Sequence, residues 1–271
     1  IKINNSMHKT RLFDVRRIAM KIRVGLFGFG KTGKLVADEF IKDDNFNLTW
    51  VVKNIDCGNK YASRLLGYEE DCGKIFAAKN LDKDFFKNNG VDVIIDFSHQ
   101  QALYYYENAA NLKIPIISAV SHYEQAELKK LEDYSQETAV LYSPNITLGI
   151  NVLIVAAQIL QKIAPHADIE IIEEHFKSKQ EISGTAKKIA SNLELGSEKI
   201  HAIRVGGIVG KHEIVFGMPN QTIRLTHESI SRAAFGQGAI FAAKFLVGKS
   251  AGLYNMEYVI SDMFRNNIPV Y

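Results

Sequence analysis

The sequence predicts an α/β fold in two parts: a Rossmann-type doubly wound parallel sheet, then a second α+β domain with an open mixed sheet. Three observations lead to this prediction. A glycine-rich turn follows the first strand-like run, and strand-like and helix-like segments then alternate up to about residue 145. After that point, strand-like runs follow one another with little helix between them. Alternation of this kind is typical of βαβ units, whose crossover connections build parallel sheets.

The first part alternates apolar strand-like runs with helix-like segments. We expect strands at residues 22–27, 48–52, 91–97, 114–118 and 139–142. We expect helices at residues 31–41 and 100–111. Another helix is expected from Ser121 to about residue 136, because Ser121 and Glu124 have the spacing of a capping box. Residues 53–80 give no clear pattern.

The second part has a different order of elements. A long apolar helix is expected at residues 149–163, a strand at 168–175 and a helix beginning near Ser183. Three strand-like runs follow, at residues 202–205, 212–216 and 222–226, and a helix is expected at 239–246. Successive strands without crossover helices indicate an open, mixed sheet.

Composition and charge exclude several functional classes. The chain has 271 residues, 33 Lys and Arg, 30 Asp and Glu, and a formal net charge of +3. Residues 1–19 hold five basic residues and one acid, so the rest is close to neutral and offers no field for tracking nucleic-acid phosphates. No apolar run approaches the roughly 20 residues that span a bilayer. We therefore expect no nucleic-acid partner and no membrane association.

Cysteine and histidine usage indicates a reducing compartment. Cys57 and Cys72 lack the paired spacing of a structural zinc site, and two cysteines cannot build a multi-bridge scaffold. The eight histidines are scattered, without a metal-ligand pattern. We expect a cytoplasmic protein that holds no metal.

An apolar strand-like run follows directly after Met20. We therefore expect residues 1–19 to be a leader or an added segment. A transit peptide is the alternative, because this segment is rich in basic residues and poor in acids, although Asp14 counts against it.

The glycine-rich turn has the pattern of a dinucleotide-binding loop. It lies between the first strand and the first helix, and it reads Gly28-Phe29-Gly30-Lys31-Thr32-Gly33. In such a loop the first glycine permits a tight turn, the second admits a pyrophosphate, and the third lets helix and strand pack closely. The helix N-terminus adds a positive dipole toward the phosphates. The context of strand, turn and helix predicts dinucleotide binding, with a Gly-rich turn that binds nothing as the alternative.

The end of the second strand indicates which dinucleotide is bound. An NAD site usually has an acid about 20 residues past the glycines, where it binds the ribose 2′-hydroxyl. This sequence has Lys53 and Asn54 there, and Asp56 follows three residues after Lys53. A lysine at that position suits a 2′-phosphate, so we expect NADPH, with NADH as the alternative. Lys53 as an ordinary solvated strand end is the other interpretation.

A second group of reactive residues follows the strand at residues 168–175. His175 and Lys179 lie four residues apart, and Ser183-Gly184-Thr185 opens the next helix. The Ser-Gly-Thr segment offers hydroxyls and free N–H groups at a helix N-terminus, which suits an anion. His175 and Lys179 are proton donors beside it. These residues suggest reduction of an anionic C=N or C=C substrate; a strand-end histidine, a surface lysine and an ordinary N-cap are the alternative.

Several motifs in this order resemble a known family. The segment from Glu173 to Ala186 is similar to the family pattern E-x-H-H-x-x-K-x-D-A-P-S-G-T-A. Four further segments resemble family motifs, at residues 96–98, 143–151, 207–212 and 226–232. The chain is thereby identified as a member of the 4-hydroxy-tetrahydrodipicolinate reductase family, also called dihydrodipicolinate reductase, over nearly all of residues 20–271.

The resemblance implies a function and a role for each matched residue. It implies NAD(P)H-dependent reduction of 4-hydroxy-tetrahydrodipicolinate, a dicarboxylate, in diaminopimelate and lysine biosynthesis by a homotetramer. His175 and Lys179 would be catalytic, and Ser183, Gly184 and Thr185 would bind a substrate carboxylate. The cofactor would also contact two further segments, Ser118-Ala119-Val120 and Ser143-Pro144-Asn145-Ile146.

The domain division follows from the motifs and the resemblance together. We expect a dinucleotide-binding domain at residues 20–145, completed by residues 233–271. We expect a substrate-binding and oligomerisation domain at residues 146–232.

The sequence departs from the family pattern at three places. Phe176 stands where the family has a second histidine that contacts substrate. The loop before Ser183 is one residue short, and the loop that lies against the nicotinamide reads Ser118-Ala119-Val120-Ser121 in place of G-T-T-G. Two alternatives therefore stay open: a related imine or amino-acid dehydrogenase with another substrate, and a non-catalytic NADP-binding homologue.

Overall fold

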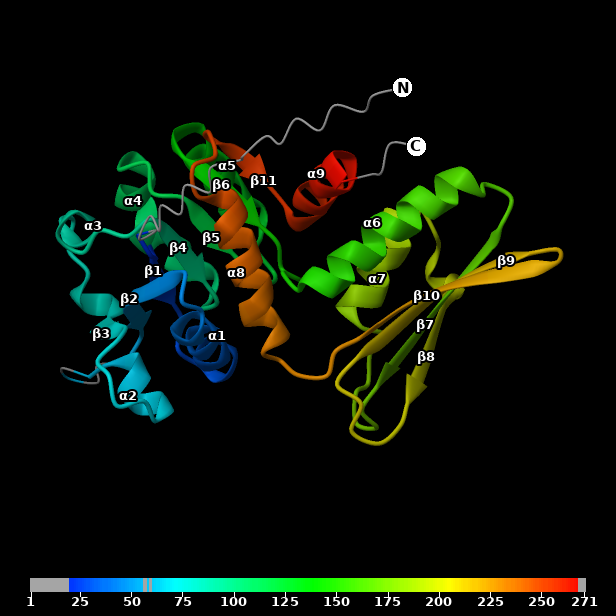
Figure 1. The fold of residues 1–271 in the computed structure, drawn as a ribbon, viewed down its shortest axis with the longest axis horizontal. Helices are drawn as coiled ribbons and strands as arrows, with labels where there is room; N and C mark the ends of the chain where they lie inside the picture. Colours follow the sequence, from blue (N-terminus) through cyan, green and yellow to red (C-terminus); the bar gives the residue numbers. More distant parts are fainter. Residues whose placement is uncertain (1–19, 56–57, 59, 268–271) are drawn as a thin grey trace, which may run out of the picture.

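The computed structural model describes residues 20–55, 58 and 60–267, and Figure 1 shows two sheets side by side. The first sheet has seven parallel strands in the order β11-β6-β5-β4-β1-β2-β3. Its strands are β1 (Ile22–Phe27), β2 (Phe46–Lys53), β3 (Lys74–Ala77), β4 (Val93–Asp96), β5 (Ile116–Ser118), β6 (Ala139–Tyr142) and β11 (Gly252–Tyr254). The strand order reverses between β1 and β4, which is the crevice where open α/β sheets bind ligands.

Helices cover both faces of this sheet. On one face lie α1 (Lys31–Lys42) and α8 (Ala234–Leu246), which pack against each other. On the other face lie the 3₁₀ helix η2 (Gln100–Tyr106), α4 (Glu107–Asn111) and α5 (Gln125–Glu137). Shorter elements flank the sheet, namely α2 (Ala62–Leu66), η1 (Ala78–Asn80) and α3 (Phe85–Asn88).

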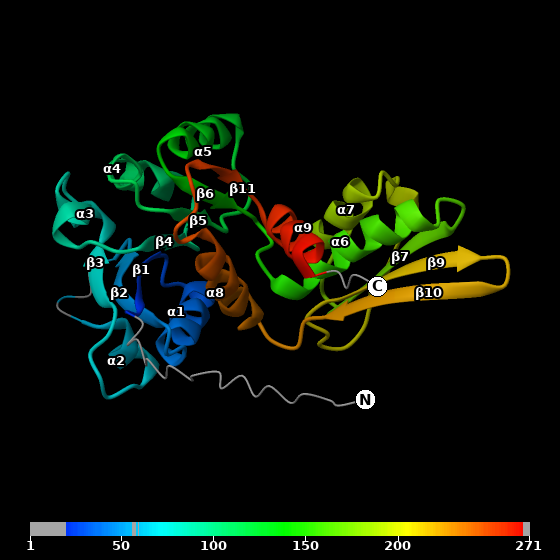
Figure 2. The ribbon, with the colours of Figure 1, turned by 45° about the horizontal axis from the view of Figure 1, so that its top comes forward.

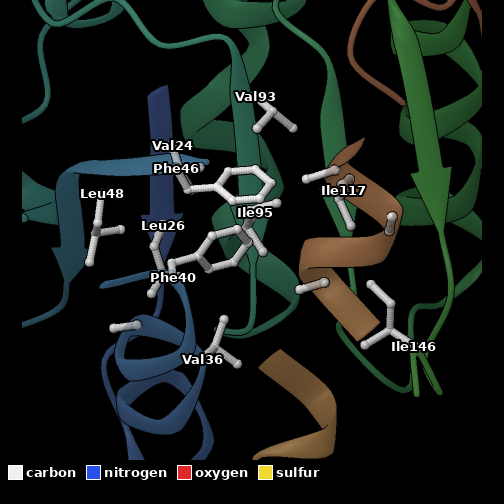
Figure 3. Packing of buried hydrophobic residues seen from close by; sticks show 14 of the residues in the cluster. Val24, Leu26, Val36, Phe40, Phe46, Leu48, Val93, Ile95, Ile117 and Ile146 are labelled. Atoms are coloured by element: carbon white, nitrogen blue, oxygen red, sulfur yellow. The ribbon is translucent and has the colours of Figure 1, made fainter. Parts of the chain in front are cut away.

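Two buried clusters, one on each face, explain the apolar strands. Val24 and Leu26 pack with Phe40 of α1 on one face, as Figure 3 shows. Phe27 and Trp50 pack with η2 on the other face. Because both faces are covered, the central strands carry apolar residues at successive positions.

The second sheet has four strands in the order β10-β9-β7-β8. Strand β7 (Asp168–His175) runs parallel to β8 (Ile200–Arg204) and antiparallel to β9 (Lys211–Met218), and β10 (Gln221–Glu228) completes the sheet. Helices α6 (Leu148–Ile163) and α7 (Gly184–Asn192) pack on one face, and η3 (Ser197–Lys199) precedes β8. Among the elements that the structure describes, Figures 1 and 2 show no helix on the other face.

The chain links the two sheets through two connections. It passes to the second sheet after β6 and returns after β10 (Figure 1). The last helix, α9 (Met256–Asn267), then packs against α6 and α8 (Figure 2). In the described part of the chain, no helix is long and apolar enough to cross a bilayer.

The structure confirms the predicted fold class and corrects several elements. The helix predicted from Ser121 was wrong at its start: α5 begins at Gln125, and Glu124 and Glu127 form the capping box. His122 has a φ of 63°, which is incompatible with a right-handed helix at that position. The helix predicted at residues 100–111 is a 3₁₀ helix that becomes α-helical only from Glu107.

Several elements had no sequence prediction. Residues 53–80 contain α2, β3 and η1, and the chain adds β11 and α9 after residue 246. The expected leader, residues 1–19, lies outside the described residues, as do Asp56 and Cys57.

A glycine in the central strand makes room for the indole of Trp50. Gly25 of β1 lies opposite Trp50 of β2, and a Cβ at Gly25 would overlap the indole ring. The ring is fixed in place, because its Nε1 donates to the carbonyl of Asn89 at 2.9 Å and its edge packs on Phe27.

We predict that Gly25→Ala destabilises the fold by about 1–3 kcal/mol, because the added methyl overpacks a buried site. Gly217→Ala is the control, since Gly217 also lies in a strand but a Cβ there meets nothing closer than 3.8 Å. It should stabilise by about 0.5–1 kcal/mol through reduced backbone entropy. Urea unfolding measures both; equal effects of the two substitutions would contradict the packing argument.

Candidate functional site

The glycine-rich turn leaves an open helix N-terminus. Gly28 has a φ of 97°, and a Cβ there would lie 2.6 Å from the carbonyl oxygen of Phe97. A Cβ at Gly33 would overlap the carbonyl of Gly28, so α1 packs directly on the turn. At Gly30 a Cβ would meet nothing within 4 Å, and no side chain caps the helix that starts there. The free N–H groups therefore face open space that suits a phosphate.

Two pockets lie on either side of this turn. The first, which we call the β2 pocket, has a volume of about 370 Å³ and is lined by Gly28, Phe29, Gly30, Lys53 and Tyr105, among others. The second, the β5 pocket, has about 520 Å³ and is lined by Thr32, Ala119, Val120, Pro144 and Phe235, among others. Phe97, Ser98 and His99 line both. An extended ligand with phosphates at Gly30 fits this arrangement.

Lys53 lies in the β2 pocket at the end of β2. It forms no salt bridge with the residues that the structure describes, and Asn54 beside it is 3.2 Å from the His99 ring. Among the described residues, the pocket therefore presents a cation without a counter-ion where the sequence predicted a 2′-phosphate contact.

Several other predicted cofactor residues line neither pocket. Ser118, Ser143 and Ile146 are buried, and Ser143 Oγ donates to the carbonyl of Asn145 at 2.9 Å. Lys31 is exposed at the first turn of α1. Their contacts with a cofactor remain predictions.

A third pocket lies between the sheets. We call it the His175 cleft; its volume is about 670 Å³. The cleft lining includes His175, Phe176, Lys179 and Thr185, so the structure brings these predicted residues together. Ser183 and Gly184, which were also predicted to bind substrate, are not part of the lining. Phe235 lines both this cleft and the β5 pocket, so the two cavities adjoin.

A buried carboxylate organises the cleft. Glu173 is completely buried on β7, and its side chain contacts His175 Nδ1. Its Oε1 accepts a hydrogen bond from Arg204 Nη2 at 2.6 Å and one from the Ser183 amide at 3.3 Å. Because Nδ1 points to Glu173, the other ring nitrogen, Nε2, is left to face Gly210 and the cleft.

The same arginine holds the short loop before Ser183. Arg204 Nε donates to the carbonyl of Lys179, and Nη2 donates to that of Glu181, each at 2.9 Å. These bonds tie the loop to β8 and so fix Lys179 at the cleft.

Electrostatics separate the roles of these groups. Burial alone would raise the pKa of Glu173, but the Arg204 hydrogen bond and the charge of His175 outweigh it and leave the pKa below its usual value. Burial lowers the pKa of His175, Glu173 raises it, and Lys179 and Arg204 lower it; the net shift is downward. Glu173 is therefore ionised near pH 7, next to a histidine that loses its proton more readily than usual.

Ser183 is engaged inside the protein. Its hydroxyl oxygen accepts from the Ala186 amide at 3.0 Å and lies 3.0 Å from His212 Nε2. Only one of the two expected hydroxyls, that of Thr185, lines the cleft. Burial lowers the pKa of His212 to about 4, so this ring is neutral near pH 7.

A hydrogen-bonded turn joins the two sheets at the cleft. Asn145 Nδ2 donates to Thr185 Oγ1 at 3.1 Å, and Asn145 Oδ1 accepts from Thr147 Oγ1 at 2.8 Å. Asn151 Nδ2 donates to the carbonyls of Asn145 and Thr147, both at 2.8 Å. Because Asn145 uses Thr185 as an acceptor, the Thr185 O–H stays available as a donor to an anion.

Glu173, His175 and His212 form a group of metal-ligand type, with ligand atoms within 4.8 Å of one another. The Arg204 guanidinium already binds the same carboxylate, so a metal ion would sit beside a fixed positive charge. We make no metal assignment, and the expectation of a metal-free protein stays a prediction.

The sequence did not point to Glu173, Arg204 or His212 as parts of the site. A signal exists for Glu173, because residues two apart on a strand share a face, which puts Glu173 beside His175. No such signal exists for Arg204, which lies 31 residues from Glu173 and reaches it through strand pairing.

We predict that Glu173→Gln lowers the pKa of His175 further, because the negative charge that favours the imidazolium is lost. Glu174→Gln is the control, because the Glu174 carboxylate forms a salt bridge with Lys211 Nζ at 2.8 Å and not with the His175 ring. Proton NMR titration of the His175 ring measures both variants, at temperatures where each is folded. A pKa that stays the same or rises in Glu173→Gln would contradict the assignment.

Comparisons with known proteins identify the family that the chain resembles. The family model described as dihydrodipicolinate reductase, N-terminus, matches residues 22–146, and the C-terminus model matches residues 149–260. A 4-hydroxy-tetrahydrodipicolinate reductase from Caldanaerobacter subterraneus subsp. tengcongensis is 39% identical over 192 residues, which cover 62% of this chain and 76% of that protein. One from Buchnera aphidicola subsp. Schizaphis graminum is 30% identical over 271 residues, which cover 89% and 98%.

The fold has a solved counterpart. A dipicolinate-bound dihydrodipicolinate reductase from Paenisporosarcina sp. TG-14 matches with a TM-score of 0.70 at 21% identity, over 87% of this chain and 98% of that one. The motifs, the paired family models and the relatives matched over nearly their full length agree. The chain belongs to the dihydrodipicolinate reductase family.

Proposed function

We propose that this protein catalyses the NAD(P)H-dependent reduction of 4-hydroxy-tetrahydrodipicolinate to tetrahydrodipicolinate, in diaminopimelate and lysine biosynthesis, with NADPH as the preferred cofactor. Family membership and the names of the relatives support the reaction. The uncapped N-terminus of α1 and the open space at Gly30 support binding of a dinucleotide.

One observation carries the proposal. His175, Lys179 and Thr185 line a single cleft, and Phe235 is shared between this cleft and the β5 pocket. A nicotinamide in the β5 pocket would therefore adjoin a substrate held among cationic and proton-donating groups. That juxtaposition is what hydride transfer to an anionic substrate requires.

The residues that line the cleft have different roles in the proposed reaction. The bound dinucleotide supplies the hydride, while water is lost from the substrate ring. Lys179, and His175 in its protonated form, would donate the proton and polarise the ring, and Glu173 orients His175. Thr185 and the free N–H groups at Gly184 hold a carboxylate at the start of α7. Closure of the cleft would exclude water and strengthen these interactions.

The wider setting is also part of the proposal. The second sheet has one face that no described helix covers, which supports its use as an oligomer interface in a homotetramer.

The pairing of α8 with α1 supports completion of the dinucleotide-binding domain, residues 20–145, by residues 233–271, and leaves 146–232 as the substrate-binding domain. We propose a cytoplasmic location, consistent with the low cysteine content.

We predict that Lys179→Ala lowers kcat by about 10²–10⁴-fold, the usual contribution of a positioned proton donor. NADPH binding should be unchanged, because Lys179 lines the His175 cleft and neither cofactor pocket. Lys177→Ala, two residues away and outside the cleft lining, is the control. Steady-state kinetics and NADPH titration separate the two effects; a kcat within twofold of wild type would remove Lys179 from the mechanism.

We predict that Lys53→Glu shifts the cofactor preference from NADPH toward NADH, because it places a carboxylate where a 2′-phosphate would lie. Lys87→Glu on α3 makes the same charge change away from the pocket lining and should leave the preference unchanged. The ratio of kcat/KM for NADPH and NADH is the measurement. A wild type that already prefers NADH, or an unchanged ratio in Lys53→Glu, would show that Lys53 does not select the cofactor.

Phe176 favours a second candidate, a related imine or amino-acid dehydrogenase with another substrate. Phe176 is 38% exposed and lines the His175 cleft, where the family pattern has a histidine. A phenyl ring cannot donate to a carboxylate. An apolar patch there would suit a substrate with less charge on that side.

We predict that Phe176→His lowers KM for 4-hydroxy-tetrahydrodipicolinate if the proposed reaction is correct. One charge-assisted hydrogen bond contributes about 1.5–3 kcal/mol, less any packing lost with the ring. Phe176→Leu, which removes the aromatic ring without adding a donor, is the control. An unchanged or higher KM in Phe176→His would favour the alternative dehydrogenase.

A further inference from the structure

A tyrosine outside the pocket lining is hydrogen-bonded to the start of the loop after β5. Ser118, the last residue of β5, is completely buried, and its Oγ lies 2.9 Å from the hydroxyl of Tyr123. The same Oγ accepts a hydrogen bond from the Val120 amide at 3.4 Å. The Tyr123 hydroxyl, the Ser118 side chain and the Val120 backbone therefore form a continuous chain of hydrogen bonds.

A second buried polar residue lies next to this chain. Asp96, at the end of β4, pairs in register with Ser118 and is also completely buried. Its carboxylate accepts from Tyr106 Oη at 3.0 Å and from the Ser98 amide at 2.8 Å, and its backbone carbonyl accepts from the Ala119 amide at 2.9 Å. Both sides of the loop's first turn are thus held by groups buried in the first sheet.

The loop itself forms a wall of the β5 pocket. Ala119, Val120, Ser121 and His122 line it, whereas Ser118 and Tyr123 do not. The loop contains no glycine, and it turns at His122, whose φ is 63° and whose carbonyl accepts from the Gln100 side chain. Side chains thus hold the loop at two backbone groups, the Val120 amide and the His122 carbonyl.

We propose that the hydroxyl of Tyr123 is a positioning group that, through Ser118, fixes the Val120 segment in the shape that receives the nicotinamide ring. This inference rests on the proposed use of a nicotinamide cofactor. It does not depend on the identity of the substrate. Tyr123 contacts the loop from behind the pocket, so it acts on the cofactor indirectly.

The protonation state of Tyr123 is consistent with this role. Burial raises its pKa, and the charge of Asp96 raises it further. The phenol therefore keeps its proton at neutral pH, and either hydroxyl can donate in the hydrogen bond between Tyr123 and Ser118.

The test compares Tyr123→Phe with Tyr142→Phe. Tyr142 is a matched control because its ring packs on that of Tyr123 at 5.3 Å, while its hydroxyl makes no hydrogen bond with a described residue. Each variant is titrated with the dinucleotide that the wild type binds more tightly, NADPH or NADH. Each is also titrated with the matching fragment that lacks nicotinamide, 2′,5′-ADP or ADP. Ser118→Ala removes the same hydrogen bond and gives a second reading if Tyr123→Phe does not fold.

We expect the Kd for the dinucleotide to rise about two- to tenfold in Tyr123→Phe and in Ser118→Ala, the effect of one hydrogen bond. The Kd for the fragment should not change, and Tyr142→Phe should match the wild type for both ligands. For the dinucleotide, the Kd of the variant with both Tyr123→Phe and Ser118→Ala should not exceed the higher of the two single-variant Kd values. Both substitutions break the same chain of hydrogen bonds.

Two results would overturn the inference. Tyr123→Phe that binds the dinucleotide as tightly as Tyr142→Phe would show that the hydroxyl does not position the loop. Equal weakening of dinucleotide and fragment would show a general structural role. A wild type that binds the dinucleotide but turns over no dipicolinate precursor would contradict the proposed reaction and leave these binding results decisive for Tyr123.

Discussion

The buried carboxylate of Glu173 is the interaction on which the candidate active site depends. It contacts His175, binds Arg204 and accepts the amide of Ser183, so it joins β7, β8 and the start of α7. Burying an ionised group carries a large desolvation cost, which these partners offset. Removing Arg204 would leave this carboxylate without its guanidinium partner in the interior. Glu173 thus places His175 directly. It acts on Lys179 through Arg204 and on Thr185 through the start of α7.

This arrangement also accounts for the short loop before Ser183. The loop has lost a residue relative to the family pattern, yet Lys179 still reaches the cleft, because Arg204 binds the carbonyls on both sides of Gln180. At the other side of the cleft, Asn145 ties Thr185 to the connection between the sheets. Thr185, which would bind a substrate carboxylate, is therefore hydrogen-bonded directly to the connection between the two sheets.

How much of this could be predicted from the sequence depends on how local each feature is. The β1–Gly28–α1 unit was predicted because its signals are adjacent in sequence. The Ser183 cap was predicted for the same reason, and Ser183 does cap α7. Strand β11 has only three residues, at the edge of the sheet, which is too short to show the alternation of apolar and polar residues typical of a strand. The start of α5 was misplaced because Glu124 and Glu127 also fit a capping box.

The site was predictable only in part. His175, Lys179 and Thr185 were found through motifs, and the structure brings them together. The pairing of Glu173 with Arg204 arises from strand register, and the engagement of Ser183 by His212 joins residues 29 positions apart. Such contacts are set by tertiary packing, and a single sequence carries no local signal for them.

The central claim is that the His175 cleft and the β5 pocket together reduce a cyclic dicarboxylate. The most direct test follows NADPH oxidation by the wild-type protein with freshly prepared 4-hydroxy-tetrahydrodipicolinate and identifies the product. We expect turnover at about 1 s⁻¹ or faster, with tetrahydrodipicolinate formed in equal amount to the NADPH consumed. Oxidation no faster than the substrate-free blank, by a protein that binds NADPH, would contradict it.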